Sequence, residues 1–81
     1  MEQDTPTQRA ANVLRDVADD QRLSIADVAR RAGHGYESTR RKLTGVGPIT
    51  LDEFAAYCAI LELDPADVIR AAIPTAVDDL T

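Results

Sequence analysis

The feature that most constrains the fold is a very short connection, Gly33-His34-Gly35, between two segments with helical periodicity. The residues before it place apolar side chains at three- and four-residue spacing, which is typical of one face of a helix. Three residues are too few to reverse the chain fully, so two helices joined here must cross at a steep angle. Glycine also permits the left-handed conformation that such a turn needs. The sequence therefore predicts helices at 25–32 and 36–43 in a helix-turn-helix arrangement.

Three further helices are predicted from their N-terminal signals. Thr5-Pro6 opens a helix at 6–21, Thr50 opens one at 51–61 with Glu53 completing a capping box, and Asp64-Pro65 opens one at 65–73. We therefore expect an all-α, compact five-helix domain spanning 1–81, with an acidic tail at 75–81. The inward side chains expected on the first and fourth helices are Ala10, Val13, Leu14, Val17 and Ala18, and Leu51, Phe54, Tyr57, Cys58 and Leu61.

The chain lacks the residue clusters that enzymes and metal sites require. It has one cysteine, Cys58, and one histidine, His34, with no nucleophile beside the histidine and no Gly-rich phosphate loop. We therefore expect no enzymatic activity, cofactor, metal ion or small-molecule substrate. No apolar run is long enough to span a membrane, and the acidic start is unlike a signal peptide, so we expect a cytoplasmic protein with no membrane partner.

The charge is distributed unevenly along the chain. The net charge is −5, which by itself argues against binding to phosphate groups. Residues 21–50, however, carry six basic and two acidic side chains, whereas the rest of the chain carries three basic and twelve acidic ones. The positive charge therefore coincides with the two helices around the short turn. It could simply solvate two helix faces, or it could form a narrow surface for nucleic acid.

Four segments resemble the phage repressor and Cro-like helix-turn-helix family, of the xenobiotic-response-element type: Ser24–Gly33, Ser38–Gly45, Pro48–Phe54 and Leu61–Pro65. The most specific feature is the small residue Ala29 followed four positions later by Gly33. The resemblance implies a lambda-repressor-like fold and sequence-specific binding of double-stranded DNA by a bacterial or bacteriophage transcriptional regulator, a repressor or Cro-like protein. It also implies a homodimer on DNA, for which Ile73, Val77 and Leu80 are the remaining apolar candidates.

The resemblance also assigns roles within helix 36–43, which it places in the major groove. Thr39 then faces the core where relatives carry an aliphatic residue, and its hydroxyl could bond a backbone carbonyl one turn back. Instead of contacting bases, Glu37 and Arg41 could form an ion pair at i, i+4, and Tyr36 could cover the edge of the core. The candidates for base readout are Tyr36, Glu37, Arg40 and Arg41, and those for phosphate contacts are Ser24, Ser38, Lys42, Thr44 and Thr50.

A second function remains open. The acidic first, fourth and fifth helices could bind a protein partner, such as a toxin, a repressor or RNA polymerase, because a fold does not by itself determine function. The sequence therefore supports a DNA-binding regulator and, as the alternative, a protein-interaction module built on the same fold.

Overall fold

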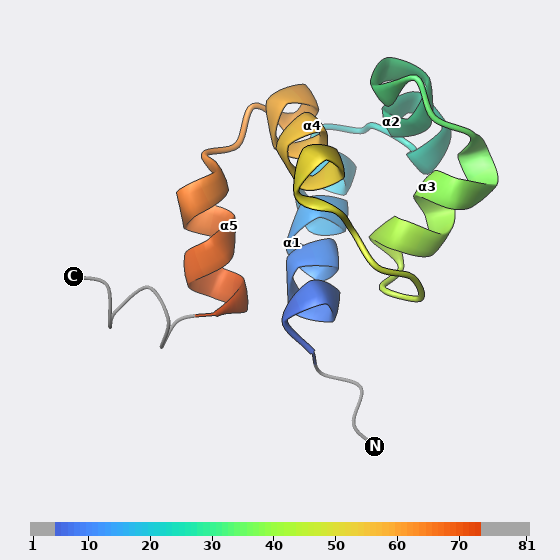
Figure 1. Ribbon diagram of the computed structural model, residues 1–81. Coiled ribbons are helices and arrows are strands. Elements are labelled where there is room, and N and C mark those ends of the chain that lie inside the picture. Colours follow the sequence, from blue (N-terminus) through green and yellow to red (C-terminus); the bar gives the residue numbers. More distant parts are fainter. Residues whose placement is uncertain (1–4, 74–81) are drawn as a thin grey trace.

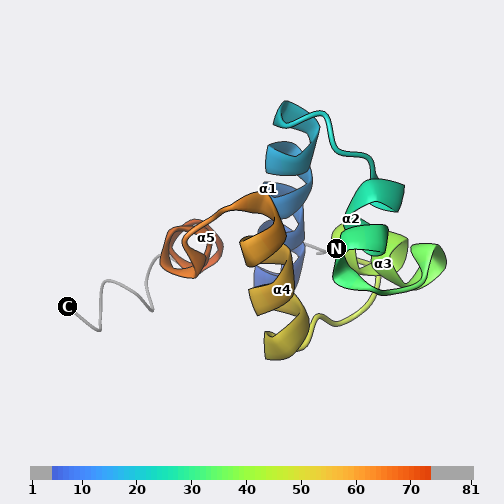
Figure 2. The same cartoon turned by 90° about the horizontal axis from the view of Figure 1, so that it is seen from above.

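The computed structural model describes residues 5–73, and this part of the chain contains five α-helices and no strand. The predicted all-α, five-helix architecture is thereby confirmed. In Figures 1 and 2, α1 and α4 lie in the middle, with α2 and α3 on one side and α5 on the other. The acidic tail, including Val77 and Leu80, lies outside the described residues. The helices are α1 (Pro6–Asp20), α2 (Ile25–Ala32), α3 (Tyr36–Leu43), α4 (Leu51–Leu61) and α5 (Pro65–Ala72), so that α1 and α5 each end one residue earlier than expected.

Side-chain caps explain where four of the helices begin. The Thr5 hydroxyl accepts a hydrogen bond from the Gln8 amide, and the Asp64 carboxylate accepts one from the Ala66 amide. Ser24 and Thr50 each form a complete capping box, in which the acidic residue three positions later bonds back to the cap amide. α3 differs, because its N-cap is glycine and no side chain caps it. These local bonds satisfy backbone amides that a helix start otherwise leaves unpaired.

Glycines shape both loops around α3. Gly33 ends α2 in the left-handed conformation, with φ of 73°, and the next amide, that of His34, donates to the Ala29 carbonyl at 3.0 Å. Gly45 follows α3 with φ of 79°, and a Cβ built on it would lie 2.7 Å from the Cγ of Gln8. The loop between α3 and α4 is therefore held against α1, where only glycine fits without a shift of the neighbouring side chain.

Every helix contributes to one core. Tyr57, Leu14 and Leu43 are among its largest fully buried side chains. Leu51 was expected to face inward, and that expectation is wrong, because the residue is 82% exposed. It stands at the first position of α4, one turn before Phe54, where the helix extends beyond the edge of the core. Leu51 instead lines a surface groove with apolar neighbours that include Ile49, Phe54, Ile69 and Ile73.

Helix α1 holds the ends of the three helices that follow the short turn. Two long polar side chains of α1 and that of its C-cap residue each donate a hydrogen bond to the carbonyl of the last residue of a different helix. These bonds satisfy carbonyls that have no partner within their own helix. They run from Arg9 Nε to Ala72 (2.8 Å), from Arg15 Nη1 to Leu43 (2.6 Å) and from Gln21 Nε2 to Leu61 (2.8 Å).

Candidate nucleic-acid interface

Helix α3 has one buried face and one broad polar face. Only Thr39, which the resemblance placed toward the core, and Leu43 are buried, while Tyr36 is 52% exposed. Because Tyr36 is so exposed, it does not serve mainly to cover the edge of the core. The last turn carries three successive cations, at positions 40 to 42. A helix whose last turn carries three cations, one of which, Arg41, is exposed, is suited to meet an anionic partner.

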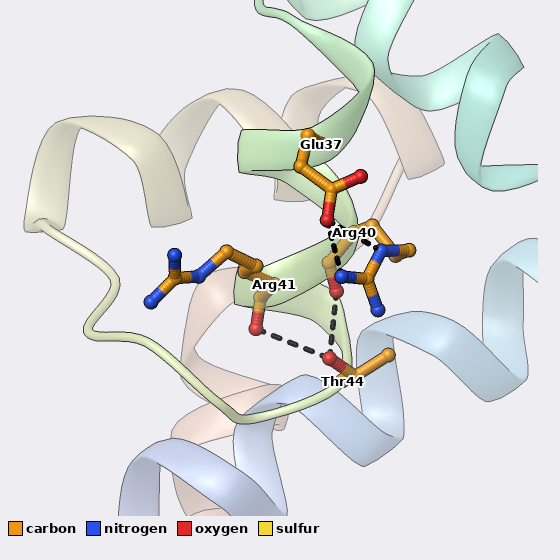
Figure 3. Close-up of polar contacts among 4 residues, drawn as sticks. All are labelled: Glu37, Arg40, Arg41 and Thr44. Atoms are coloured by element: carbon orange, nitrogen blue, oxygen red, sulfur yellow. Dashed lines mark hydrogen bonds and ion pairs between the residues drawn. The ribbon is translucent and has the colours of Figure 1, made fainter.

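The single acidic side chain of α3 is paired with Arg40. Arg40 Nε donates to Glu37 Oε2 at 3.1 Å, and its Nη2 contacts the same oxygen (Figure 3). The hydrogen bond and charge of Arg40 lower the pKa of Glu37, and Glu37 in turn raises the pKa of Arg40. The alternative of an ion pair between Glu37 and Arg41 is therefore wrong as stated. The i+3 side chain lies closer to the carboxylate than the i+4 side chain does.

Arg41 is left without a partner by this pairing. Its guanidinium forms no side-chain hydrogen bond or ion pair with the residues that the structure describes, and it points away from the Glu37–Arg40 pair, toward the loop before α4 (Figure 3). Its charge still helps to lower the pKa of Glu37. Between α3 and this loop lies a cleft of about 420 Å³, lined by Glu37, Ser38, Arg41, Lys42, Gly47 and Pro48.

The phosphate candidates fall into three groups. Ser24 and Thr50 are exposed at helix starts, where each hydroxyl oxygen accepts a backbone amide and keeps its own proton available. Thr44, by contrast, donates its hydroxyl proton to the Arg40 carbonyl at 2.7 Å, with the Arg41 carbonyl at 3.2 Å (Figure 3). In the free protein, therefore, Thr44 has no hydroxyl proton to offer a phosphate oxygen.

The other two candidates belong to a bridge between α3 and α4. Lys42 Nζ donates to Ser38 Oγ at 2.7 Å and lies 3.4 Å from Glu53 Oε2. The Glu53 Oε1 atom accepts the Thr50 amide at 2.9 Å, and this bond, with a smaller contribution from Lys42, lowers the pKa of Glu53. The bridge therefore links one turn of α3 to the capping box of α4.

Two hydroxyls are buried beneath α3 without a hydrogen-bond partner. They belong to Thr39 and Tyr57, and both residues are fully buried. The expected bond from Thr39 to a carbonyl one turn back does not form. Burial raises the pKa of Tyr57, while the nearby Thr39 hydroxyl opposes this rise without reaching hydrogen-bond geometry. The underside of α3 therefore contains an unsatisfied polar pair.

Comparison with known protein families agrees with this geometry. Residues 13–72 match the Cro/C1-type helix-turn-helix (HTH) DNA-binding domain, a stretch that contains α2 to α5 and most of α1. The chain belongs to the Cro/C1-type HTH family. Neither a curated protein nor a solved structure shows significant similarity to it. Membership of the Cro/C1-type family supports binding to double-stranded DNA and a role in transcription regulation.

No three His, Cys, Asp or Glu side chains within residues 5–73 are grouped to hold a metal ion. His34 is exposed in the turn, with its ring edge-on to Tyr57 at 6.3 Å between centroids. No described helix is long and apolar enough to cross a lipid bilayer.

Two contacts that position α3 were not anticipated from the sequence. They are the hydrogen bond from Arg15 to the Leu43 carbonyl and the bridge from Lys42 to Glu53. Both join residues on different helices. No periodicity or capping pattern reports on such contacts, so no local signal could have revealed them.

Proposed function

We propose that this Cro/C1-type domain is a repressor or Cro-like regulator that reads double-stranded DNA with the exposed face of α3. The observation that carries the proposal is the position of Arg41, which is exposed, unpartnered in the described structure and beside a cleft at the edge of the helix. An exposed guanidinium without a partner can donate two parallel hydrogen bonds to the O6 and N7 atoms of a guanine. Arg41 is therefore assigned as the principal base-reading residue.

The other base-reading candidates act beside Arg41. Glu37 uses Oε2 to bind Arg40, which leaves Oε1 able to accept a hydrogen bond from a cytosine amino group. Arg40 then orients the carboxylate, or it releases Glu37 and reads a base itself. Tyr36, at the exposed start of α3, offers a ring for a thymine methyl group or a hydroxyl for a phosphate.

The proposed phosphate contacts come from the hydroxyls of Ser24, Ser38 and Thr50. All three residues are exposed, and their oxygen atoms accept bonds from within the protein, so their protons can point outward. Such contacts fix the register of a protein on DNA without reading its sequence. Thr44 could join them only if it gives up its bond to the Arg40 carbonyl.

We further propose that the domain binds as a homodimer to a pseudo-palindromic site. The apolar groove that contains Leu51, Ile69 and Ile73 is the described surface best suited to contact a second copy. Two such domains would place their recognition helices about 34 Å apart, one turn of DNA.

A protein-interaction module is the second candidate function. The exposed acidic residues of α4, α5 and the turn between them favour it, because they would repel DNA and attract a basic partner. They are Asp52, Glu62, Asp64 and Asp67.

Fluorescence anisotropy on a random-sequence duplex tests the choice between the two functions. The DNA-binding proposal expects at least micromolar affinity at low salt, and a slope of log affinity against log salt of about −3 to −6, since each neutralised phosphate contributes about −0.9. The Arg70→Ala variant is the control and should bind with the same affinity and slope. Arg70 is an exposed, paired arginine on α5, on the other side of the molecule from α3. No binding, or a slope near zero, would favour the protein-interaction module.

A further inference from the structure

Lys42 differs from the other two cations of α3 in its surroundings. Its side chain is only 18% exposed, compared with 41% for Arg40. The ammonium group already has an oxygen of Ser38 at 2.7 Å and a carboxylate oxygen of Glu53 at 3.4 Å. Lys42 is therefore largely withdrawn from the exposed face on which Arg41 lies.

Glu53 cannot readily move away to release Lys42. Its Oε1 atom accepts the Thr50 amide at 2.9 Å, while its own amide donates to the Thr50 hydroxyl at 3.1 Å. Swinging the carboxylate outward would break the capping box that starts α4. The carboxylate is ionised at neutral pH, as an ordinary glutamate is, and the same hydrogen bond lowers its pKa further. The charge of Lys42 is therefore compensated within the protein.

The bridge also connects two places where DNA contacts are proposed. Ser38 lies on the exposed part of α3, and Thr50 is the N-cap of α4. Lys42 donates to the Ser38 hydroxyl and pairs with Glu53, and Glu53 accepts a hydrogen bond from the Thr50 backbone amide. This ion pair is thus a direct side-chain link between α3 and the capping box of α4.

We infer that Lys42 is a positioning residue, which fixes α3 relative to the start of α4 through Glu53, rather than a phosphate contact. This inference rests on the proposed DNA-binding function. It differs from the sequence-based expectation, in which Lys42 would neutralise a phosphate. A positioning residue changes how well the remaining contacts fit the DNA, but it releases no counterion of its own.

The test compares Lys42→Met with the wild type on a duplex that the wild-type chain has enriched from a random library. Methionine keeps an apolar stem of similar length and removes the ammonium group. The inference expects affinity to fall about 3- to 10-fold, the effect of one lost hydrogen-bonded contact, with an unchanged salt slope. Lys42→Arg, which can keep the ion pair, should restore most of the affinity. Circular dichroism establishes that each variant is folded at the temperature used.

Two results would overturn the inference. A salt slope that becomes about 0.9 less negative in Lys42→Met would show that Lys42 neutralises a phosphate. Unchanged affinity in a folded Lys42→Met variant would show that the bridge stabilises the fold without positioning α3 for DNA. Failure of the proposed function is a separate outcome, because the wild-type chain itself would then enrich no duplex and show a slope near zero.

Discussion

Replacement of Thr39 by valine should stabilise this domain, because it removes a buried hydroxyl that has no partner. Thr39 is fully buried, and its oxygen bonds neither a backbone carbonyl nor the neighbouring Tyr57 hydroxyl. Burying an unpaired hydroxyl costs about 1–3 kcal/mol, and valine has the same branched shape. The new methyl group lies against the Tyr57 hydroxyl, which loses its polar neighbour. We therefore expect a smaller net gain, of about 0.5–1.5 kcal/mol.

Urea denaturation of Thr39→Val, Tyr57→Phe and the double variant measures this effect. In a thermal melt, a gain of 1 kcal/mol in a domain of this size corresponds to a rise in Tm of about 4–8 °C. If neither hydroxyl has a partner, the two substitutions should add within about 0.5 kcal/mol. A destabilised Thr39→Val variant, with a coupling free energy of about 1 kcal/mol or more between the two sites, would refute the reasoning, because it would show that the hydroxyls bond to each other in solution.

Three further substitutions test other parts of the structure. Arg15→Met should lower the free energy of unfolding in urea by about 1.5–3 kcal/mol, because it removes a charge-assisted bond to the Leu43 carbonyl; an unchanged midpoint would contradict this role. The pKa of Asp27 is lowered from 3.8 to about 2 by its bond to the Ser24 amide and by Arg30. Its ionised form therefore stabilises the fold fully above pH 4, and this effect is lost as pH falls toward 2. Asp27→Asn should show a shallower acid transition than the wild type, and equally steep transitions would contradict this role. Leu51→Ser should leave stability nearly unchanged and shift sedimentation toward monomer. If the wild type is a dimer and the variant sediments as the same dimer, the groove is not the interface.

The helix starts could be predicted from the sequence because their causes are local. Ser24 and Thr50 each bond to a residue three positions away, and Gly33 adopts the left-handed conformation that the turn requires. The inward orientation of Thr39 was implied by the family resemblance, and the residue lies one turn before the buried Leu43. Such features depend on neighbours along the chain, so the sequence displays them directly.

The errors arose where packing between elements decides the outcome. Leu51 fits the apolar periodicity of α4 but lies beyond the core, and periodicity cannot show where a neighbouring helix ends. The Glu37 pairing is a separate case within one helix, because arginines stand at both i+3 and i+4 and helical spacing alone does not select Arg40. The ion pair of Lys42 with Glu53 joins two helices that a loop separates along the chain, so it depends on a tertiary geometry that no local pattern encodes.

The central claim is that Arg41 gives α3 its ability to read a base, and one measurement tests it most directly. The affinity of Arg41→Ala is compared on an enriched duplex and on a random duplex, with Arg70→Ala as the charge-matched control from α5. We expect Arg41→Ala to lose about 1–3 kcal/mol on the enriched duplex and little on the random one, so that discrimination at one base pair is lost. Equal losses on the two duplexes would contradict direct readout by Arg41.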